Sequence, residues 1–195
     1  MSLKMRDIGP LWSDSKSTDR IFYLNNLVGC LWKATEERTK VPHPMTGKVL
    51  ALVPHTRYLD LSDFKASMAA CPIHGLHNPL RDQKRYLNLG EVCFRAAIAL
   101  SDKENADYFV RQISCVVPKD YDQAMAEVVV TARFLKTFAG NNVRFLGKGE
   151  TVPGDGVGHE AIHYPWPFGP VAIITPFNFP LEIPALQLMG ALFMG

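Results

Sequence analysis

The clearest candidate for chemistry is a small polar island near the end of the chain. Thr175 and Asn178 stand there between Pro176 and Pro180, after an apolar run at residues 171–174 and before an apolar helical pattern. A short apolar run ahead of a helix is typical of a central strand in a parallel sheet, buried on both faces. Ligands bind such sheets at the carboxyl ends of the strands, so a ligand site is predicted around Thr175 and Asn178. The plainer interpretation is that Asn178 is only a turn residue between two prolines.

A second candidate is the run His159-Glu160-Ala161-Ile162-His163, which matches the His-Glu-x-x-His motif of zinc peptidases. That chemistry needs both histidines on one face of a helix, the glutamate beside them as general base and a third metal ligand. Three glycines precede the run and two prolines follow it within four residues, so any helix there would be too short to be stable. We therefore expect a strand whose histidine and glutamate side chains face solvent, and a zinc peptidase is the disfavoured alternative.

Two further patterns match known binding motifs only in part. Gly156-Val-Gly158-His-Glu-Ala161 spells a dinucleotide-binding fingerprint, but it lacks a strand before it and a helix after it. Cys71, His74 and His77 have the tight spacing of metal ligands, but no fourth ligand is evident, and the surrounding prolines and glycine indicate a rigid loop. We expect neither pattern to bind its ligand, so no metal site is predicted.

The elements that must position these residues follow from apolar periodicity and turn signals. Two strand-like stretches within residues 22–53 flank the turn Met45-Thr46-Gly47-Lys48, which predicts a β-hairpin with Gly47 at positive φ. Four helices are predicted next, the first capped by Asp60 with Asp63 in the capping-box position, and the last ended by Gly140. Their predicted inward faces are, in chain order, Leu61, Phe64 and Met68; Leu89, Val92, Ala96 and Leu100; Phe109, Ile113 and Val116; and Met125, Val128, Ala132 and Leu135.

The helical period disappears between residues 146 and 164. Alternation of Ile162, Tyr164 and Trp166 with other residues predicts an extended arm in that region. After the apolar run at 171–174, a last helix is predicted, whose apolar pattern comprises Ile183, Leu186, Leu188, Leu192 and Phe193.

Composition bounds the class of protein. The 195 residues allow one or two domains, and 47% hydrophobic with 21% charged residues is ordinary for a globular protein. A net charge of +2 gives no reason to expect nucleic acid as a partner. Four prolines between residues 170 and 184 interrupt the apolar end of the chain, so a membrane span is not expected. The four cysteines are scattered, which favours a reduced compartment over a disulfide framework.

The run Ile173-Ile-Thr-Pro-Phe-Asn-Phe-Pro180 resembles the aldehyde dehydrogenase signature Pro-Trp-Asn-(Phe/Tyr)-Pro, with Phe177 in the place of the tryptophan. The resemblance extends from about Leu24 to the last residue. Five further stretches are similar to one subgroup, the Δ1-pyrroline-5-carboxylate (glutamate-γ-semialdehyde) dehydrogenases of plants and protists; they are residues 71–79, 85–87, 117–119, 143–146 and 164–170.

The resemblance implies an α/β, aldehyde dehydrogenase-like fold, of which this chain would be a truncated N-terminal portion. Residues 1–20 would be a polar tail and residues 21–150 the hairpin and helical layer of the cofactor-binding domain. Residues 151–168 would form the oligomerisation arm, and residues 169–195 the first strand and helix of the Rossmann-type sheet.

The family's site residues transfer to the polar island one by one. Asn178 is expected to donate to the oxyanion, while Ile174, Thr175, Pro176 and Phe177 are expected to border NAD. The nucleophilic cysteine and the general-base glutamate of the family have no match here, so the chain alone is expected to be inactive.

Partners and compartment follow from the same resemblance. It implies an aldehyde substrate, most specifically glutamate-γ-semialdehyde in proline catabolism, and a homo-oligomer joined through the arm. It implies the mitochondrial matrix, although three aspartates within residues 1–20 are unlike a presequence, and a cytoplasmic location is the alternative. A different class of function also stays open, in which the chain is a non-catalytic partner or regulator of a full-length homologue through the arm.

Overall fold

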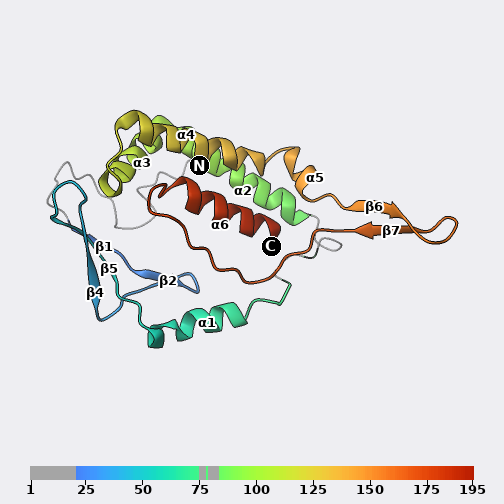
Figure 1. Cartoon of the computed structure of the whole chain (residues 1–195), viewed down its shortest axis with the longest axis horizontal. Helices are drawn as coiled ribbons and strands as arrows, with labels where there is room; N and C mark the ends of the chain where they lie inside the picture. Colours follow the sequence, from blue (N-terminus) through green and yellow to red (C-terminus); the bar gives the residue numbers. More distant parts are fainter. Residues whose placement is uncertain (1–20, 75–77, 79–83) are drawn as a thin grey trace. The chain divides into compact units, whose positions relative to one another are not determined.

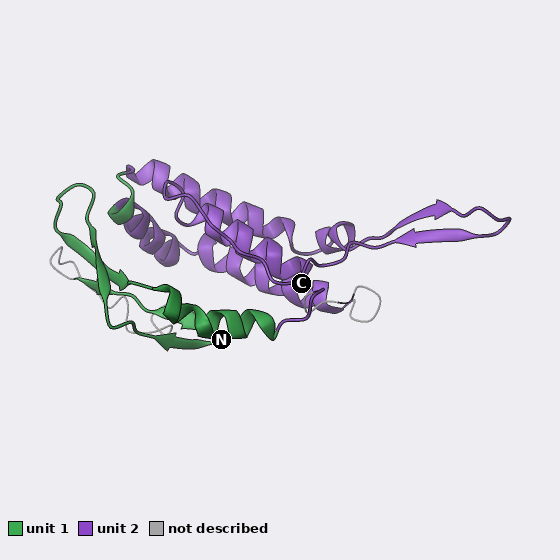
Figure 2. Ribbon diagram, turned by 60° about the horizontal axis from the view of Figure 1, so that its bottom comes forward, with its two compact units in different colours: residues 1–70, 115–118 green, residues 71–114, 119–195 purple. Residues whose placement is uncertain are grey.

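Two hairpins and a short helix make up the first of two compact units into which the chain divides. The computed structural model describes residues 21–74, 78 and 84–195 (Figure 1). The first unit comprises residues 1–70 and 115–118, and the second comprises residues 71–114 and 119–195 (Figure 2). The domain boundaries expected from the sequence stay a prediction.

The hairpin expected around Gly47 is confirmed. Strands β4 (Arg38–Pro42) and β5 (Val49–Pro54) are antiparallel, and Gly47 has a φ of 68° in the turn between them. Strand β1 (Phe22–Tyr23) adds to β5 in parallel, which gives a three-stranded sheet in the order β1-β5-β4.

A second hairpin in this unit was not predicted. Strands β2 (Asn26–Val28) and β3 (Leu31–Lys33) pair through a two-residue turn in which Gly29 and Cys30 both have positive φ, 55° and 62°. Two positive φ angles are what a tight hairpin turn requires, but cysteine at the second position is not a turn signal that sequence reasoning would use.

The first predicted helix is present, with a different start. A 3₁₀ turn, η2 (Tyr58–Leu61), leads directly into α1 (Ser62–Ala69). Asp60 was expected to be the cap, but it lies inside the turn, where its carboxylate accepts from the backbone N–H of Arg57 at 2.7 Å. The expected inward face is also incorrect in part, because Met68 is half exposed.

The second unit is built on three helices that lie side by side, α2 (Lys84–Ser101), α4 (Tyr121–Thr137) and α6 (Glu182–Met194) (Figures 1 and 2). Helix α3 (Lys103–Val116) connects α2 to α4, and the short helix α5 (Asn142–Leu146) follows α4. Asp120 caps α4 by accepting from the Gln123 N–H at 2.7 Å. The main core of this unit comprises Ala97, Leu100, Ala106, Val110, Ile113, Ala124, Val128, Ala132 and Leu135.

The predicted inward face of α4 is confirmed, whereas that of α2 is shifted. Of the four residues expected inward on α2, only Leu100 is buried; the others are half-buried or, like Val92, exposed. The helix turns its small residues inward because its neighbours approach closely: a Cβ at Gly90 would lie 2.7 Å from Val143 Cγ1 and 3.0 Å from the Phe138 carbonyl oxygen. The spacing of the large apolar residues of α2 predicts a different face from the one that is buried.

The arm is confirmed as extended chain. Strands β6 (Glu150–Pro153) and β7 (Glu160–His163) form an antiparallel hairpin that runs away from the helices of its own unit (Figure 1). All eight strand residues are exposed. Residues Glu160–His163 of the zinc-peptidase motif therefore lie on a strand, as expected, with His159 directly before it, and not on the helix that such a site needs.

The strand predicted at residues 171–174 is not formed. Residues 171–176 have no regular secondary structure, although the helix expected after them is present as α6. A strand is defined by its ladder to a neighbour, and no strand in the described part of the chain pairs with this segment. The prediction of a strand from apolar content and length alone is therefore wrong for this segment.

Helix α6 is only partly covered. Phe193 is fully buried, with its ring centroid 5.1 Å from that of Tyr86 and 5.6 Å from that of Phe138. Leu188 and Leu192, which belong to the predicted apolar pattern of this helix, are 50% and 44% exposed. None of the helices that the structure describes combines the length and the apolar character needed to cross a membrane.

Candidate functional site

The predicted site residues lie together on the irregular segment that leads into α6 (Figure 1). The side chains of Ile174 and Phe177 are 96% and 84% exposed. Thr175 between them is half-buried, and Pro176 and Asn178 are exposed. Two large apolar side chains are thus exposed to solvent beside a hydroxyl and an amide. Exposed apolar surface next to polar groups is typical of a site that binds a ligand or another chain.

Asn178 occupies a turn immediately before the helix. Among the residues that the structure describes, its side-chain amide has no hydrogen-bond partner, which leaves both N–H groups able to donate. An exposed amide next to apolar side chains can orient a carbonyl or stabilise an oxyanion.

The backbone just after Asn178 is held by a buried carboxylate from α4. Glu127 is 3% exposed, and its Oε1 accepts from the N–H of Leu181 at 2.8 Å and of Glu182 at 3.1 Å. The first N–H groups of a helix have no partner inside the helix, and they carry the positive end of its dipole. Glu127 therefore caps α6 from another helix, which replaces the missing side-chain cap of its own N-terminus.

Lys119 completes this arrangement. Its Nζ lies 2.7 Å from Glu127 Oε2, and both side chains are largely buried. The same Nζ lies 4.1 Å from the centroid of the Phe179 ring, which is within the range of a cation–π contact. The charge of Glu127 is thus balanced by one cation and two backbone N–H groups, as a buried charge requires.

Sequence reasoning missed this pair, although a signal was present. Glu127 falls on the inward face of the predicted helix, between Ala124 and Thr131, which are both buried. Charged residues are almost never fully buried unless they are paired. A glutamate at that helical position therefore indicated a buried partner.

The other end of the segment is fixed by a close backbone contact. Gly169 has a φ of 92°, and a Cβ there would lie 2.1 Å from the carbonyl oxygen of Ile73. Only glycine fits such an approach without displacing the neighbouring chain. The segment that bears the site residues is therefore anchored at Gly169 and at the N-terminus of α6.

Burial changes the acidity of two of the four thiols. Cys93 is fully buried, and burial raises the pKa of its thiol. Burial likewise raises the pKa of Cys115. Because the thiolate is the reactive form, a raised pKa makes both thiols less reactive at a given pH than an ordinary exposed thiol.

The burial of Cys93 and the exposure of Cys30 predict a large difference between their alkylation rates. We expect iodoacetamide to label the exposed Cys30 rapidly and Cys93 at least about a hundredfold more slowly, since a local opening of ~3 kcal/mol must come first. Peptide mass spectrometry of time points gives both rates in one sample. Labelling in urea is the control, in which both should react alike; equal rates in native buffer would contradict the burial of Cys93.

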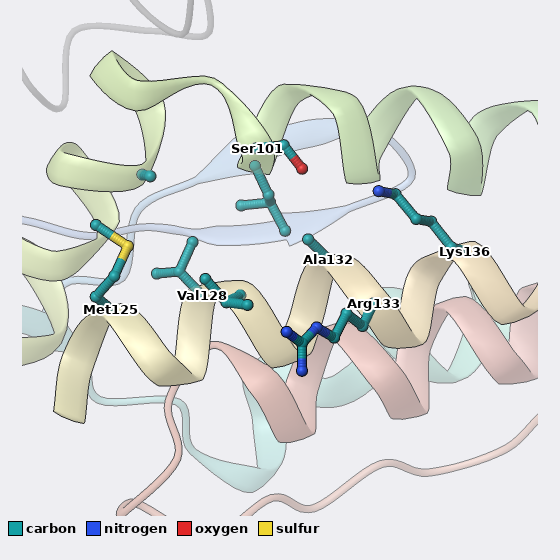
Figure 3. A pocket seen from close by; sticks show the side chains of 9 residues that line it. Ser101, Met125, Val128, Ala132, Arg133 and Lys136 are labelled. Carbon is teal, nitrogen blue, oxygen red and sulfur yellow. The ribbon is translucent and has the colours of Figure 1, made fainter. Parts of the chain in front are cut away.

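A separate hollow of about 250 Å³ lies between α2, α3 and α4 (Figure 3). Core residues such as Val128 and Ala132 line it together with the exposed Arg133 and Lys136 of α4, while Ser101 donates its hydroxyl to the Ala97 carbonyl oxygen at 2.8 Å. The hydroxyl is thus engaged within its own helix, and we assign no chemistry to this hollow.

The described residues of the remaining motifs gather no metal-ligand set. Cys71 is half-buried and His74 is exposed, while His77 lies outside the described residues. Within the ranges that the structure describes, no three histidine, cysteine, aspartate or glutamate side chains lie close enough to hold a metal ion. The partial dinucleotide fingerprint at 156–161 spans the tip of the β6–β7 hairpin, where the His159 N–H donates to the Gly156 carbonyl oxygen at 3.0 Å.

Comparison with known proteins decides the family. The model of the aldehyde dehydrogenase family matches residues 31–195. The chain belongs to the aldehyde dehydrogenase family. The resemblance carried by the run 173–180 is therefore confirmed.

Two plant proteins are similar to this aldehyde dehydrogenase chain over most of its length. A probable aldehyde dehydrogenase of Linum usitatissimum is 45% identical over 170 residues, which cover 87% of this chain and 31% of the relative. The mitochondrial Δ1-pyrroline-5-carboxylate dehydrogenase 12A1 of Arabidopsis thaliana is 44% identical over 164 residues, 84% of this chain and 30% of the relative. The chain thus spans about a third of the length of the curated relatives it matches.

Solved aldehyde dehydrogenase structures confirm the fold class. Aldehyde dehydrogenase 21 of Physcomitrella patens, in complex with the product succinate, gives a TM-score of 0.69 at 22% identity over 89% of this chain and 35% of that one. A putative methylmalonate-semialdehyde dehydrogenase of Sinorhizobium meliloti 1021, complexed with NAD, gives a TM-score of 0.64 at 22% identity. The match covers 91% of this chain and 34% of that one. An NADP-dependent glyceraldehyde-3-phosphate dehydrogenase of Bacillus halodurans C-125, complexed with NADP, gives a TM-score of 0.67 at 24% identity. The match covers 89% of this chain and 36% of that one. At these identities the matches establish the fold alone.

Proposed function

We propose that this chain is part of an enzyme that oxidises glutamate-γ-semialdehyde to glutamate with NAD, a step of proline catabolism. The observation that supports this choice of substrate is the 44% identity over 164 residues to the Arabidopsis Δ1-pyrroline-5-carboxylate dehydrogenase. Relatives named for malonate semialdehyde are more distant, for example the one from Lacticaseibacillus casei at 30% identity.

In this proposal Asn178 stabilises the charge that appears during oxidation. Attack of a thiolate on an aldehyde carbon leaves negative charge on the carbonyl oxygen of the tetrahedral intermediate. The Asn178 amide is exposed and unengaged within the described residues, so an N–H group can donate to that oxygen. A donor held in place before the charge develops lowers the barrier, because no reorganisation is needed at the moment of reaction.

Ile174, Thr175, Pro176 and Phe177 are proposed to border the dinucleotide. The residues fit that group: Ile174 and Phe177 present almost fully exposed apolar surface that a flat heteroaromatic ring can cover, and Thr175 adds a hydroxyl. When bound, NAD would accept the hydride released from the tetrahedral carbon. A nicotinamide cofactor also accompanies two of the matching structures, as NAD in one and NADP in the other.

The β6–β7 hairpin is proposed to join copies of the enzyme. Its strands expose every residue, and β6 and β7 pair only with each other within the described chain, so both have a free edge for a further strand. We propose the mitochondrion as the compartment, by analogy with the Arabidopsis relative. Residues 1–20 lie outside the described residues.

Two assays side by side test the proposed function. We expect the enzyme that contains this segment to reduce NAD with glutamate-γ-semialdehyde faster than with malonate semialdehyde. The 195-residue chain alone is expected to show no rate above the no-enzyme control, because the family's nucleophile and base have no match in it. Absorbance of NADH at saturating substrate gives both rates. Preference for malonate semialdehyde would refute the proposed substrate, and turnover by the 195-residue chain would refute the assignment of the missing groups.

A further inference from the structure

The contact between α4 and the start of α6 assigns a role to a residue that the signature does not contain. We propose that Glu127, paired with Lys119, is a positioning residue that acts on catalysis through Asn178. The proposal rests on the oxyanion role of Asn178 in the proposed function, which it deepens by naming what holds that residue in place.

The geometry brings the anchor close to Asn178 along the chain. Glu127 Oε1 holds the backbone N–H groups of Leu181 and Glu182, and Leu181 is only three residues beyond Asn178. Pro180 in between has a fixed φ, which limits how far the turn can move independently of its anchor. A shift of the α6 N-terminus is therefore transmitted to the Asn178 amide.

Lys119 holds the same turn from a second point. Its Nζ contacts Glu127 Oε2 at 2.7 Å and lies over the ring of Phe179, the residue directly after Asn178. The carboxylate and the ammonium group thus fix both the backbone and a side chain within three residues of Asn178.

Stability alone does not account for a charged pair at this place. Both ions lose most of their hydration when buried, and well-packed apolar residues of similar volume are often as stabilising or more so. A carboxylate offers what an apolar side chain cannot, namely an acceptor for the unpaired N–H groups of α6 in one fixed geometry. The pair is therefore suited to place the turn rather than to add to the core.

A double-mutant cycle in the complete enzyme tests the proposal. In the wild-type background, we expect Glu127→Gln to lower kcat by about tenfold with little change in KM or NAD affinity, since displacement of a catalytic group costs rate. In the Asn178→Ala background, Glu127→Gln should lower kcat no further, because the group through which it acts is gone. Lys119→Met should behave like Glu127→Gln, and Lys119→Arg, which keeps the cation, should retain most of the rate.

Val128→Ala is the matched control. Val128 is the buried neighbour of Glu127 on α4, and neither hydrogen bond to the α6 N–H groups involves it. We expect Val128→Ala to lower the unfolding midpoint. It should change kcat of the folded enzyme by the same factor whether residue 178 is asparagine or alanine. If Glu127→Gln reduces kcat by the same factor with and without Asn178, its role is merely structural and the proposal is wrong.

Hydrogen exchange separates this inference from the proposed function. We expect the amides of Leu181 and Glu182 to be protected in the wild type and to lose protection in Glu127→Met, which has no oxygen to accept from them, but not in Val128→Ala. If the wild-type enzyme oxidises no aldehyde, the proposed function fails, and unchanged protection in Glu127→Met would then overturn the anchoring as well. If the enzyme is active but the two amides keep their protection, the positioning role of Glu127 is refuted on its own.

Discussion

Replacement of Asn178 with alanine is expected to lower kcat of the complete enzyme by roughly 10²–10³-fold, or about 2.7–4 kcal/mol of transition-state stabilisation. The amide would meet charge that exists only on the oxygen of the tetrahedral intermediate, so its loss should affect the rate more than ground-state binding. Asn178 is exposed in a turn that is anchored on both sides, and truncation of its side chain therefore removes a donor without opening the core.

Steady-state kinetics and NAD titration of a folded Asn178→Ala enzyme decide this prediction. Asn178→Asp is the informative companion, because it keeps the size of the side chain but replaces a donor by a carboxylate that repels the oxyanion. We expect it to be at least as damaging as alanine. A near-normal kcat in Asn178→Ala, or a loss confined to NAD affinity, would exclude Asn178 as the oxyanion donor.

Gly169→Ala is expected to destabilise the fold by roughly 3 kcal/mol or more. Two costs combine at this position. The φ of 92° is one that residues with a Cβ rarely adopt, and the new Cβ would lie 2.1 Å from the Ile73 carbonyl oxygen, so the backbone of one segment must move. Displacement of Gly169 also releases the start of the segment that carries the candidate site.

Two other glycines separate these costs. Gly158→Ala places a Cβ at a φ of 77° with nothing within 4 Å, so it reports backbone strain alone. Gly190→Ala meets only Phe138 Cζ at 3.7 Å, an ordinary contact, so it reports neither cost. Urea unfolding should rank the loss of stability as Gly169→Ala, then Gly158→Ala, then Gly190→Ala. Equal losses for the first two would show that the contact with Ile73 carries no energy.

Local signals predicted the parts of the fold that local physics decides. The hairpin around Gly47 follows from a turn that needs positive φ, and the inward face of α4 follows from large apolar residues at helical spacing. The β6–β7 hairpin follows from glycines and prolines that exclude a stable helix around His159 and His163. In each case the residues that decide the structure are close together in the sequence.

Features that depend on tertiary neighbours could not be predicted in the same way. The inward face of α2 is chosen by the close approach of Val143 and Phe138 to Gly90, which are about fifty residues away in sequence. The run at 171–174 has the composition of a buried strand, but a ladder needs a partner strand. Of the candidate site, the signature around Asn178 was found from its residue types, whereas the support from Glu127 depends on a contact across 54 residues.

The contact made by Glu127 on α6 also bears on how this part of the protein can vary in evolution. Because the carboxylate binds main-chain N–H groups, the side chains at positions 181 and 182 take no part in the bond, and substitutions there are tolerated by the anchor. The exception is proline, which has no N–H to donate. Drift is therefore constrained at positions 119 and 127, which should change together, while the anchor itself places no demand on the side chains at the start of the helix it holds.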